Sequence, residues 1–240
     1  LMVFVLFFVT FSFFFQGGGW NQNSRMCLVR SIVHHNTFTI DSCKEDTNEI
    51  EFANTGDWSF YDGHFYSNKS PGLSFMAVLP YAIAQYCLKY VLPGDHEQHV
   101  LLGTYFATLC TTALLSAILC LLIFHVCSYF FRMSITESLL AAIFYGCGTI
   151  AFSYSTTFYC HQPAAFCSFF AFLLLLHLRK DNEQKSYYAL LAGFFAGMAV
   201  LIEPSAIITL IALFIYLVCS KETRKWLTLF ILGCIPPGVV

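Results

Sequence analysis

The sequence places an aspartate and a lysine where a β-hairpin would bring them together. Within residues 54–72, Asp62-Gly63 separates two aromatic-rich arms, and Asp-Gly in this setting is the strongest short-range signal of a hairpin. Counting outward from that turn puts Asp57 across from Asn68, with Lys69 next to it. The pattern therefore predicts a carboxylate and an ammonium side by side at the open end of the hairpin. The pair is either functional or a solvated ion pair, which would contribute only about 0–1 kcal/mol to stability.

The elements that must position these residues belong to a membrane protein. Of the 240 residues, 58% are hydrophobic and only 11% are charged, whereas a soluble domain carries about 25% charged residues. The net charge of −2 is uninformative about nucleic acid, and no basic cluster suggests a nucleic-acid partner. Leu1 and Val240 both lie inside apolar runs, so we expect an N-terminal part of a longer protein. The predicted fold class is an all-α polytopic membrane protein.

Apolar runs define the expected membrane segments, since a spanning helix needs about 20 apolar residues. We predict about seven transmembrane helices, with a first helix at 1–15, a long external loop at 16–98 and the remaining helices within 99–240. The loop is expected to hold interfacial helices and the hairpin. The apolar runs are Leu1–Phe15, His99–Val126, Thr136–Phe152, Pro163–Leu178, Tyr187–Ile202, Ser205–Cys219 and Trp226–Val240.

Segment Pro71–Pro93 is long enough to cross a membrane but contains Pro80, Gln85 and Lys89. Short cytoplasmic loops of membrane proteins collect Lys and Arg. If this segment does not cross, seven of the 12 basic residues share one side in short connections, and the acidic loop 16–98 faces the other side. We therefore predict a surface-lying or re-entrant helix. The seven basic residues are Arg132, Arg179, Lys180, Lys185, Lys221, Arg224 and Lys225.

This topology places three stretches on the non-cytoplasmic side: the loop 16–98, the turn Ser153–Gln162 and the turn Glu203-Pro204. We expect any site of this protein to be assembled from them. Glu203 is either an intramembrane acid with a function or the water-exposed end of a helix, because a proline follows it. His161 is either a neutral base or phosphate donor, or an amphipathic residue that anchors the chain at the interface.

The first loop contains two further signals. Asn23-Ser24-Arg25 offers helix caps before a run with apolar residues at i, i+3 and i+4 spacing, which predicts a short amphipathic helix at the membrane interface. Its end is expected at His34-His35-Asn36. The acidic stretch from Asp41 to Glu51 has the composition of a disordered segment.

The 11 cysteines fall into two groups. Cys27 and Cys43 share the long polar loop, and they form a disulfide if that loop faces an oxidising compartment or stay reduced if it does not. The other nine, Cys160 among them, lie within or beside apolar segments, where cysteine acts as a small hydrophobe. There is no zinc-binding spacing, so the sequence predicts no metal ligands, and the possibility of a divalent cofactor stays open.

Several stretches carry a family resemblance. The run NSRMCLVRSIV, then TGDW, then GHFYSNKSPG at the start of an apolar helix resembles the first external loop of GT-C membrane glycosyltransferases. The resemblance is clearest over residues 20–75 and points to the branch with aminoarabinose lipid A transferases and protein O-mannosyltransferases. AFSYSTTFYCHQPAAF and GFFAGMAVLIEPSA agree with that family more loosely, in the order of helices.

The resemblance implies an integral-membrane enzyme that moves a sugar from a polyprenyl-phosphate carrier to a lipid, glycan or protein acceptor. It also implies a bacterial plasma membrane location, with the active face outside the cytoplasm. In such enzymes an acidic residue of the first loop activates the acceptor hydroxyl, and basic side chains hold the lipid phosphate. Lys69 matches the lysine of the family's Y-x-x-K-x-P stretch, which contacts the phosphate. Arg25 matches the arginine that opens the first interfacial helix.

The sequence departs from the family's pattern at the acidic positions. Gln22-Asn23 stand where relatives carry an acidic pair, and Asn68 replaces the acid before the family lysine. His161-Gln162 occupy a turn in which relatives often carry an acid. The catalytic base must then come from elsewhere, or activity is absent.

Asp57 and Asp41 remain as candidates for the base, and we favour Asp57 because the hairpin brings it near Lys69. Lys69, Arg25 and His161 are the expected phosphate-binding residues, and membrane lipids are expected partners. Two other functions stay open: a transporter or flippase of a lipid-linked or small solute, and a catalytically silent relative. Transporters place ionisable residues near the membrane midplane, and the helices after residue 99 carry few internal charges, which favours the enzyme.

Overall fold

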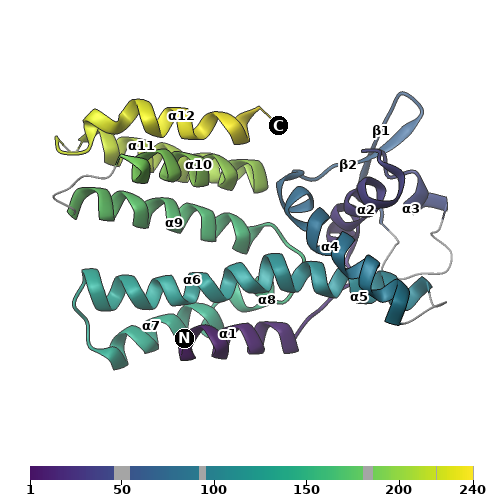
Figure 1. Cartoon of the computed structure of the whole chain (residues 1–240), viewed down its shortest axis with the longest axis horizontal. Helices are drawn as coiled ribbons and strands as arrows, with labels where there is room; N and C mark the ends of the chain where they lie inside the picture. The colour runs from purple at the N-terminus through teal and green to yellow at the C-terminus, as the bar shows by residue number, and fades with distance from the viewer. Residues whose placement is uncertain (46–54, 92–95, 181–185, 220, 240) are drawn as a thin grey trace.

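The computed structural model describes residues 1–45, 55–91, 96–180, 186–219 and 221–239. The protein has two parts, a helical bundle and a smaller unit at one end of it, which we call the cap (Figure 1). The cap contains α2 (Trp20–His35), α3 (Ser42–Glu45), β1 (Trp58–Tyr61), β2 (His64–Ser67) and α4 (Gly72–Val91). The bundle contains α1 (Met2–Phe13), α6 (Leu114–His125), α7 (Ile135–Gly148), α8 (Ala151–Ser155), α9 (His161–Lys180), α10 (Tyr187–Ile202), α11 (Ile207–Cys219) and α12 (Leu227–Gly238).

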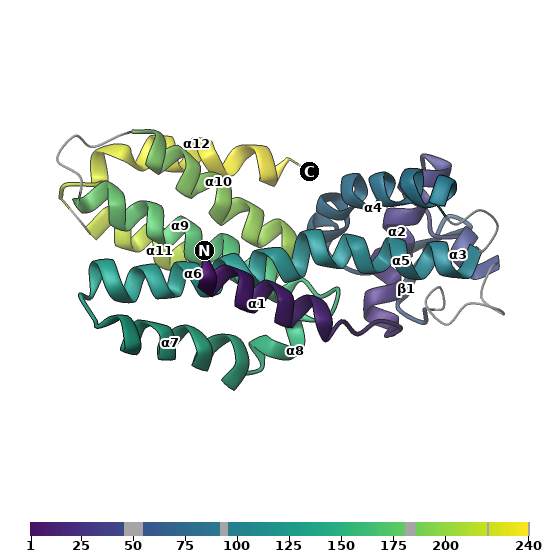
Figure 2. The ribbon, with the colours of Figure 1, turned by 60° about the horizontal axis from the view of Figure 1, so that its bottom comes forward.

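One long helix connects the two parts. It starts as α5 (His96–Thr108) beside the cap, passes through a π-helical turn at Leu109–Ala113, and continues as α6 into the bundle (Figures 1 and 2). The hydroxyl groups of Thr108 and Thr111 donate to the carbonyl groups four residues earlier. Such hydrogen bonds compete with the helical backbone pattern and favour a local distortion of the helix.

Each of the seven predicted apolar segments contains a helix, but their lengths differ from the prediction. Two described helices are long and apolar enough to cross a membrane, Glu97–Phe130 and His161–Arg179. The remaining apolar helices are shorter, because turns interrupt the runs; for example, Thr149 and Ile150 separate α7 from α8. A capping box sets the start of α7, where Ser134 and Glu137 each accept a backbone hydrogen bond from the other.

The hairpin forms as predicted. β1 and β2 are antiparallel, and the register pairs Tyr61 with His64 and Trp58 with Ser67. Asp62-Gly63 therefore forms the turn, and both residues have positive φ, as a tight hairpin turn requires.

Helix α2 is longer and more deeply buried than predicted. It begins at Trp20 rather than after Asn23-Ser24-Arg25, although it ends before Asn36 in a left-handed conformation, as expected. Every residue from Gln22 to Ser31 is buried, so the helix is enclosed on all sides and does not lie on a surface. A central place in the cap explains why its polar residues are buried together with its apolar ones.

Helix α4, which corresponds to the ambiguous segment Pro71–Pro93, packs against α2 and α5 in the cap and does not run among the bundle helices (Figures 1 and 2). One hydrophobic core joins cap and bundle. It buries Met26 of α2, Leu73 of α4, Phe158 before α9 and Ile202 at the end of α10. This core holds the first loop against the two later external turns.

Candidate functional site

A polar pocket lies where the cap meets the bundle. Its volume is about 290 Å³, and all three stretches that the topology assigned to the non-cytoplasmic side contribute to its wall. This meeting of the loop 16–98, the turn before α9 and the turn after α10 agrees with the prediction. The lining residues are Asn21, Arg25, Asn68, Lys69, Ser70, Tyr159, Cys160, His161 and Glu203.

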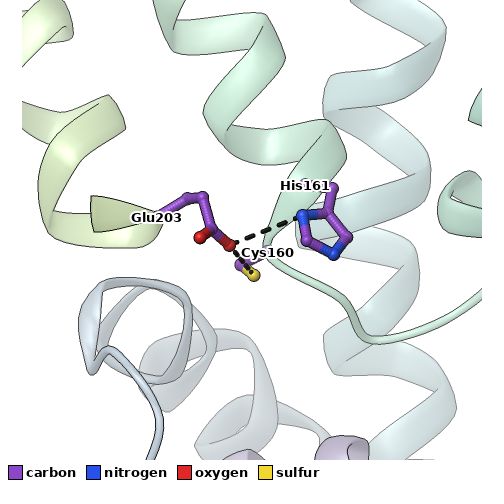
Figure 3. Close-up of side chains that lie close together, drawn as sticks. All are labelled: Cys160, His161 and Glu203. Carbon is purple, nitrogen blue, oxygen red and sulfur yellow. Dashed lines mark hydrogen bonds and ion pairs between the residues drawn. The ribbon is translucent and has the colours of Figure 1, made fainter. Parts of the chain in front are cut away.

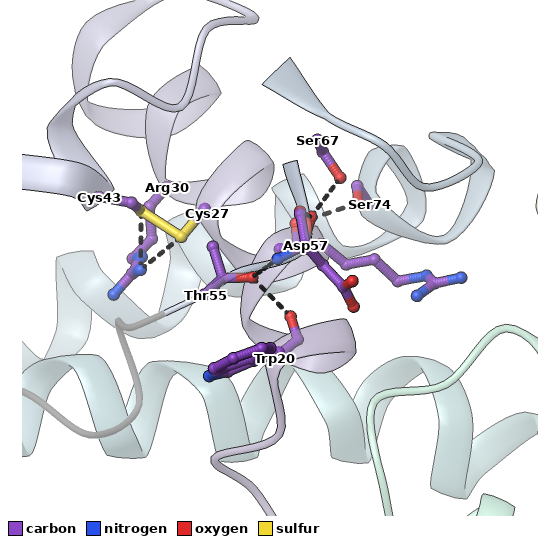
Figure 4. The surroundings of a disulfide bond; sticks show 10 residues. Trp20, Cys27, Arg30, Cys43, Thr55, Asp57, Ser67 and Ser74 are labelled. Carbon is purple, nitrogen blue, oxygen red and sulfur yellow. Dashed lines mark hydrogen bonds between the residues drawn. A yellow bond between two sulfur atoms is a disulfide. The ribbon is translucent and has the colours of Figure 1, made fainter. Parts of the chain in front are cut away.

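Hydrogen bonds attach the hairpin to α2 and so position Lys69. The hydroxyl of Ser24 donates to the carbonyl oxygen of Asp57 at 2.5 Å and lies 2.8 Å from the hydroxyl of Ser67. Thr55 bridges the same elements, because its hydroxyl donates to the carbonyl of Trp20 and accepts from the amide of Asp57 (Figure 4). These contacts place the open end of the hairpin over the first turns of α2.

Asp57 and Lys69 form the predicted pair. Lys69 Nζ lies 3.1 Å from Asp57 Oδ2, and both side chains are partly buried. Lys69 lines the pocket, whereas Asp57 contacts Lys69 and is not itself one of the lining residues. The hairpin register therefore produces the expected geometry of carboxylate and ammonium.

Arg25 places a buried positive charge on the pocket wall. The residue is only 4% exposed. Its guanidinium donates to the side chain of Asn21 and to Cys160 Sγ, the latter at 3.1 Å, and its Nε has no hydrogen-bond partner among the described residues. No ion pair within the described part of the chain includes Arg25. A buried cation that forms no direct ion pair is costly, so this arrangement favours binding of an anion in the pocket.

Cys160 and His161 begin helix α9. The amide of Ala164 donates to the carbonyl of Cys160, which makes Cys160 the residue that precedes the first helical turn. The turn before α9 is attached to the segment that follows α1, because the amide of Gln16 donates to the carbonyl of Thr156. The His161 ring packs against the ring of Tyr154, with 4.4 Å between the centroids.

Glu203 reaches the pocket because α10 ends one residue before it. Its backbone is extended, as expected for a residue before proline. Its carboxylate accepts from Cys160 Sγ at 2.7 Å and lies 3.4 Å from His161 Nδ1, so that three side chains converge (Figure 3). Burial raises the pKa of Glu203, but the Cys160 thiol, His161, the Ser205 hydroxyl and Arg25 together outweigh burial, and the pKa is lowered. The glutamate is therefore ionised at neutral pH.

The Cys160 thiol is protonated at neutral pH. Burial raises its pKa to about 11, although the nearby Arg25 opposes this effect. One ligand atom each from Cys160, His161 and Glu203 lies within 4.8 Å of the others. A sulfur, a nitrogen and an oxygen at this spacing can hold a metal ion.

Asp41, the second candidate for the base, lies outside this pocket. Its Oδ1 accepts from the amide of Phe65 at 2.7 Å, and its Oδ2 lies 2.7 Å from His64 Nδ1. The carboxylate thus ties the chain after α2 to the second strand of the hairpin. The rest of the acidic stretch, residues 46–51, lies outside the described residues.

The structure contains the disulfide Cys27–Cys43, one of the two states that the sequence left open. It joins α2 to α3, and Arg30 donates to both sulfur atoms (Figure 4). The disulfide closes a loop of residues 27–43, which contains Asp41. Disulfides persist in oxidising compartments, which agrees with a non-cytoplasmic cap.

An apolar groove adjoins the polar pocket. It has a volume of about 570 Å³ and runs between α9 and α11, and its wall includes Ala165, Phe172 and Ala212. His161 and Glu203 line both the groove and the polar pocket. The two cavities together therefore offer a charged end and an apolar end. A third cavity, of about 600 Å³, lies elsewhere in the cap, beside Arg30 and Tyr81.

Of the nine residues that line the pocket, the sequence predicted a binding role for three and misjudged one. Arg25, Lys69 and His161, the predicted phosphate-binding residues, all line the pocket. Cys160 was interpreted as a small hydrophobe, but its thiol faces Arg25 and Glu203. Its position next to His161 in an external turn was the signal that could have identified it.

A family model described as dolichyl-phosphate-mannose-protein mannosyltransferase matches residues 99–234, which is more than half of the chain. The matched region includes Cys160, His161 and Glu203 and ends before the chain does. No curated protein and no solved structure gave a match.

Proposed function

Since the chain belongs to the dolichyl-phosphate-mannose-protein mannosyltransferase family, it is a membrane glycosyltransferase that uses a polyprenyl-phosphate sugar, and we propose that it binds this donor in the polar pocket and the apolar groove. The observation that carries the proposal is the junction of the two cavities at His161 and Glu203. The donor is itself amphiphilic, with a charged phosphate on a long hydrocarbon chain. The phosphate fits the cationic pocket, and the chain fits the groove between α9 and α11.

Arg25, Lys69 and His161 hold the phosphate in this proposal. Arg25 supports this role because it is buried and no carboxylate pairs with it among the described residues. Lys69 adds a second cation on the same wall, and His161 can donate one N–H. In a site with little water, such groups stabilise the charge that develops on a departing phosphate.

Asp57 acts as the base. Its carboxylate takes the proton of the acceptor hydroxyl while the hydroxyl oxygen forms a bond to the anomeric carbon of the sugar. The bond between that carbon and the phosphate oxygen breaks, and polyprenyl phosphate leaves with the electron pair. Asp57 is suited to this role because it lies 3.1 Å from Lys69, which lines the pocket.

This assignment also accounts for the missing family acids. Gln22 and Asn23 are both buried in α2, and Asn68 lines the pocket as an amide. None of the three can accept a proton from a hydroxyl at neutral pH. Asp57 is the first-loop carboxylate nearest to the phosphate-binding lysine among the described residues.

The acceptor, a lipid, glycan or protein, enters from the non-cytoplasmic side. The Cys27–Cys43 disulfide supports this orientation of the cap, because cytosolic thiols stay reduced. The short basic connections at the opposite end of the bundle support it independently.

The test measures sugar transfer and donor binding separately. Purified full chain in nanodiscs is given radiolabelled dolichyl-phosphate mannose and membrane extract as the acceptor source. Asp57→Asn should lower the transfer rate by about 10²–10⁴-fold with nearly unchanged donor affinity, because a base acts on the acceptor. Lys69→Ala should weaken donor binding as well, because it removes a phosphate contact.

Lys89→Ala is the matched control, since Lys89 lies on α4 and lines the third cavity instead. It should leave transfer and binding unchanged. Transfer at the wild-type rate in both Asp57→Asn and Lys69→Ala, at equal protein abundance, would exclude the proposed site.

A further inference from the structure

We propose that Cys160, His161 and Glu203 bind a divalent cation of the zinc class on the wall of the polar pocket, with one coordination position open to the donor phosphate. This inference rests on the proposed function for its role and on the three side chains for its geometry. It assigns metal ligands to a site at which the sequence predicted none.

The ligand atoms already lie near the spacing that such an ion needs. Tetrahedral zinc, with bonds of about 2.0–2.3 Å, separates its ligand atoms by about 3.3–3.7 Å. His161 Nδ1 lies 3.4 Å from Glu203 Oε2, and all three ligand atoms are within 4.8 Å of one another. The hydrogen-bonded pair Cys160 Sγ and Glu203 Oε2, at 2.7 Å, must open by about 1 Å to admit the ion.

The three ligand atoms determine which kind of metal the site prefers. A thiolate, an imidazole nitrogen and a carboxylate suit zinc, whereas magnesium and calcium require oxygen ligands. Three protein ligands with an open fourth position are typical of zinc sites that act on a substrate. The open position is available here because all three residues line a cavity of about 290 Å³.

Two features beside Cys160 oppose the effect of burial on its thiol. Arg25 Nη2 lies 3.1 Å from Cys160 Sγ, and the thiol sits at the positive end of α9. Both features stabilise negative charge on the sulfur. Binding of the ion then displaces the proton of the Cys160 thiol, because a metal binds cysteine as the thiolate.

The metal changes the charge of the pocket in the direction that sugar transfer requires. Adding two positive charges and losing one thiol proton raises the net charge of the pocket by one. When the sugar leaves, its phosphate gains about 0.5 to 1 negative charge, since a phosphate diester carries about −1 and a monoester about −1.5 to −2 near pH 7. His161 can serve both roles, because binding of the ion at Nδ1 leaves the N–H at Nε2 able to donate to a phosphate oxygen.

The experiment uses the purified full chain in nanodiscs after removal of metal with a chelator. Zn²⁺ binding is measured by equilibrium dialysis with elemental analysis, and Co²⁺ is used as a spectroscopic probe. The wild-type chain should bind one equivalent, and the cobalt form should show a thiolate-to-metal charge-transfer absorption. Cys160→Ser should lose that absorption, and both Cys160→Ser and Glu203→Gln should weaken Zn²⁺ binding tenfold or more. Cys167→Ser, a buried cysteine of α9 outside the pocket, should behave as wild type.

A labelling experiment on the wild-type chain keeps the test valid if a variant fails to fold. Zn²⁺ should block alkylation of Cys160 by a small reagent that reaches the buried thiol through the pocket, and the chelator should restore it. Cys87, an exposed cysteine of α4, serves as the internal reference and should react equally in both states. Equal alkylation of Cys160 with and without Zn²⁺, or binding that is unaffected by both substitutions, would overturn the metal site.

Transfer measured in the same samples separates the two proposals. Full transfer by chain that holds no metal would refute the metal centre and leave the glycosyltransferase site intact. Stoichiometric metal at these residues in a chain that binds no dolichyl-phosphate mannose would support the metal centre and refute the proposed donor site.

Discussion

At the scale of single residues, the pocket balances charges that come from distant parts of the chain. Arg25 and Lys69 bring two cations from the first loop, and Glu203 brings a carboxylate from the end of α10. Asp57 pairs with Lys69, whereas Arg25 forms no direct ion pair in the described part of the chain and only influences the charge of Glu203. Arg25 is the more deeply buried of the two cations, and so it is the one that more strongly favours an anionic ligand.

Because the carboxylate of Asp41 binds the hairpin, we predict that the stability of the hairpin depends on pH. The hydrogen bond from the Phe65 amide, assisted by His64, lowers the pKa of Asp41 although burial opposes this. A lowered pKa stabilises the fold above the unfolded-state value of about 3.9, and that stability is lost as pH falls through the folded-state pKa. We expect the protection of the hairpin amides to fall three- to tenfold between pH 6 and pH 3, or about 1 kcal/mol for a partly exposed charged hydrogen bond.

Hydrogen exchange of the peptide containing residues 58–67, corrected for the intrinsic rate, measures this change. Asp41→Asn should reduce protection at neutral pH and flatten the pH dependence. Asp62→Asn is the control, because Asp62 occupies the exposed hairpin turn, where asparagine also tolerates positive φ. An unchanged pH profile in Asp41→Asn would show that another group controls the hairpin.

At the scale of elements, close backbone contacts set the position of the pocket. The start of α4 touches the end of α10 at Gly72, where an added Cβ would lie 2.7 Å from the backbone of Leu201 and Ile202. Glu203 follows directly on α10, and Lys69 lies three residues before Gly72. This contact therefore helps to set the distance between Lys69 and Glu203.

Substitution of Gly72 should separate the two walls of the pocket. Gly72→Ala must push α4 away from a backbone that cannot yield, at a cost of about 1–3 kcal/mol in stability. Transfer should fall tenfold or more, because small displacements of a catalytic group have large effects on rate. Gly238→Ala, whose Cβ would meet no atom within 4 Å, should change neither thermal stability nor transfer. Normal transfer by Gly72→Ala would mean that this contact does not position the site.

If the groove between α9 and α11 binds the lipid chain, the KM for the donor should depend on the length of that chain. Ala212→Phe should fill part of the groove and raise the KM for dolichyl-phosphate mannose about tenfold, because burial of the chain supplies much of the binding. A short-chain donor analogue should be almost unaffected. Ile211→Phe, on the same helix but outside the groove, is the matched control. Equal effects on long and short donors would place the lipid chain elsewhere.

At the scale of the whole molecule, the cap and the basic connections lie at opposite ends of the bundle (Figure 1). The cap carries the disulfide and the pocket, whereas the turn between α11 and α12 carries Lys221, Arg224 and Lys225. Arg179 reaches Glu222 at the same end, with 3.8 Å between the charged atoms. This polarity is what the positive-inside rule requires of a membrane protein whose cap faces outward.

Two native cysteines test this orientation without any substitution. Cys87 lies exposed on α4 in the cap, and Cys219 lies exposed at the far end of α11. A membrane-impermeant maleimide should label Cys87 in right-side-out vesicles and Cys219 in inside-out vesicles, with each site read by mass spectrometry. Detergent-treated vesicles, in which both should react, are the control. Labelling of both cysteines from one side would refute the proposed topology.

The sequence by itself determined the features that depend on neighbours along the chain. The membrane character, the apolar segments and the hairpin register follow from composition, run length and turn chemistry, and the pairing of Asp57 with Lys69 follows from the register. These patterns involve residues a few positions apart, so backbone geometry alone relates them.

Only the tertiary structure decided which distant residues meet. Cys160 contacts Arg25, 135 positions away, and Glu203, 43 positions away, and Asp41 bonds to the hairpin rather than to the pocket. Helix α2 is enclosed on all sides, although its sequence predicted a surface helix. Such contacts depend on how helices pack against each other, and that packing is set by many weak interactions and a few close backbone approaches, such as that at Gly72. No local sequence pattern predicts these contacts, because the two residues of each contact lie in different parts of the chain.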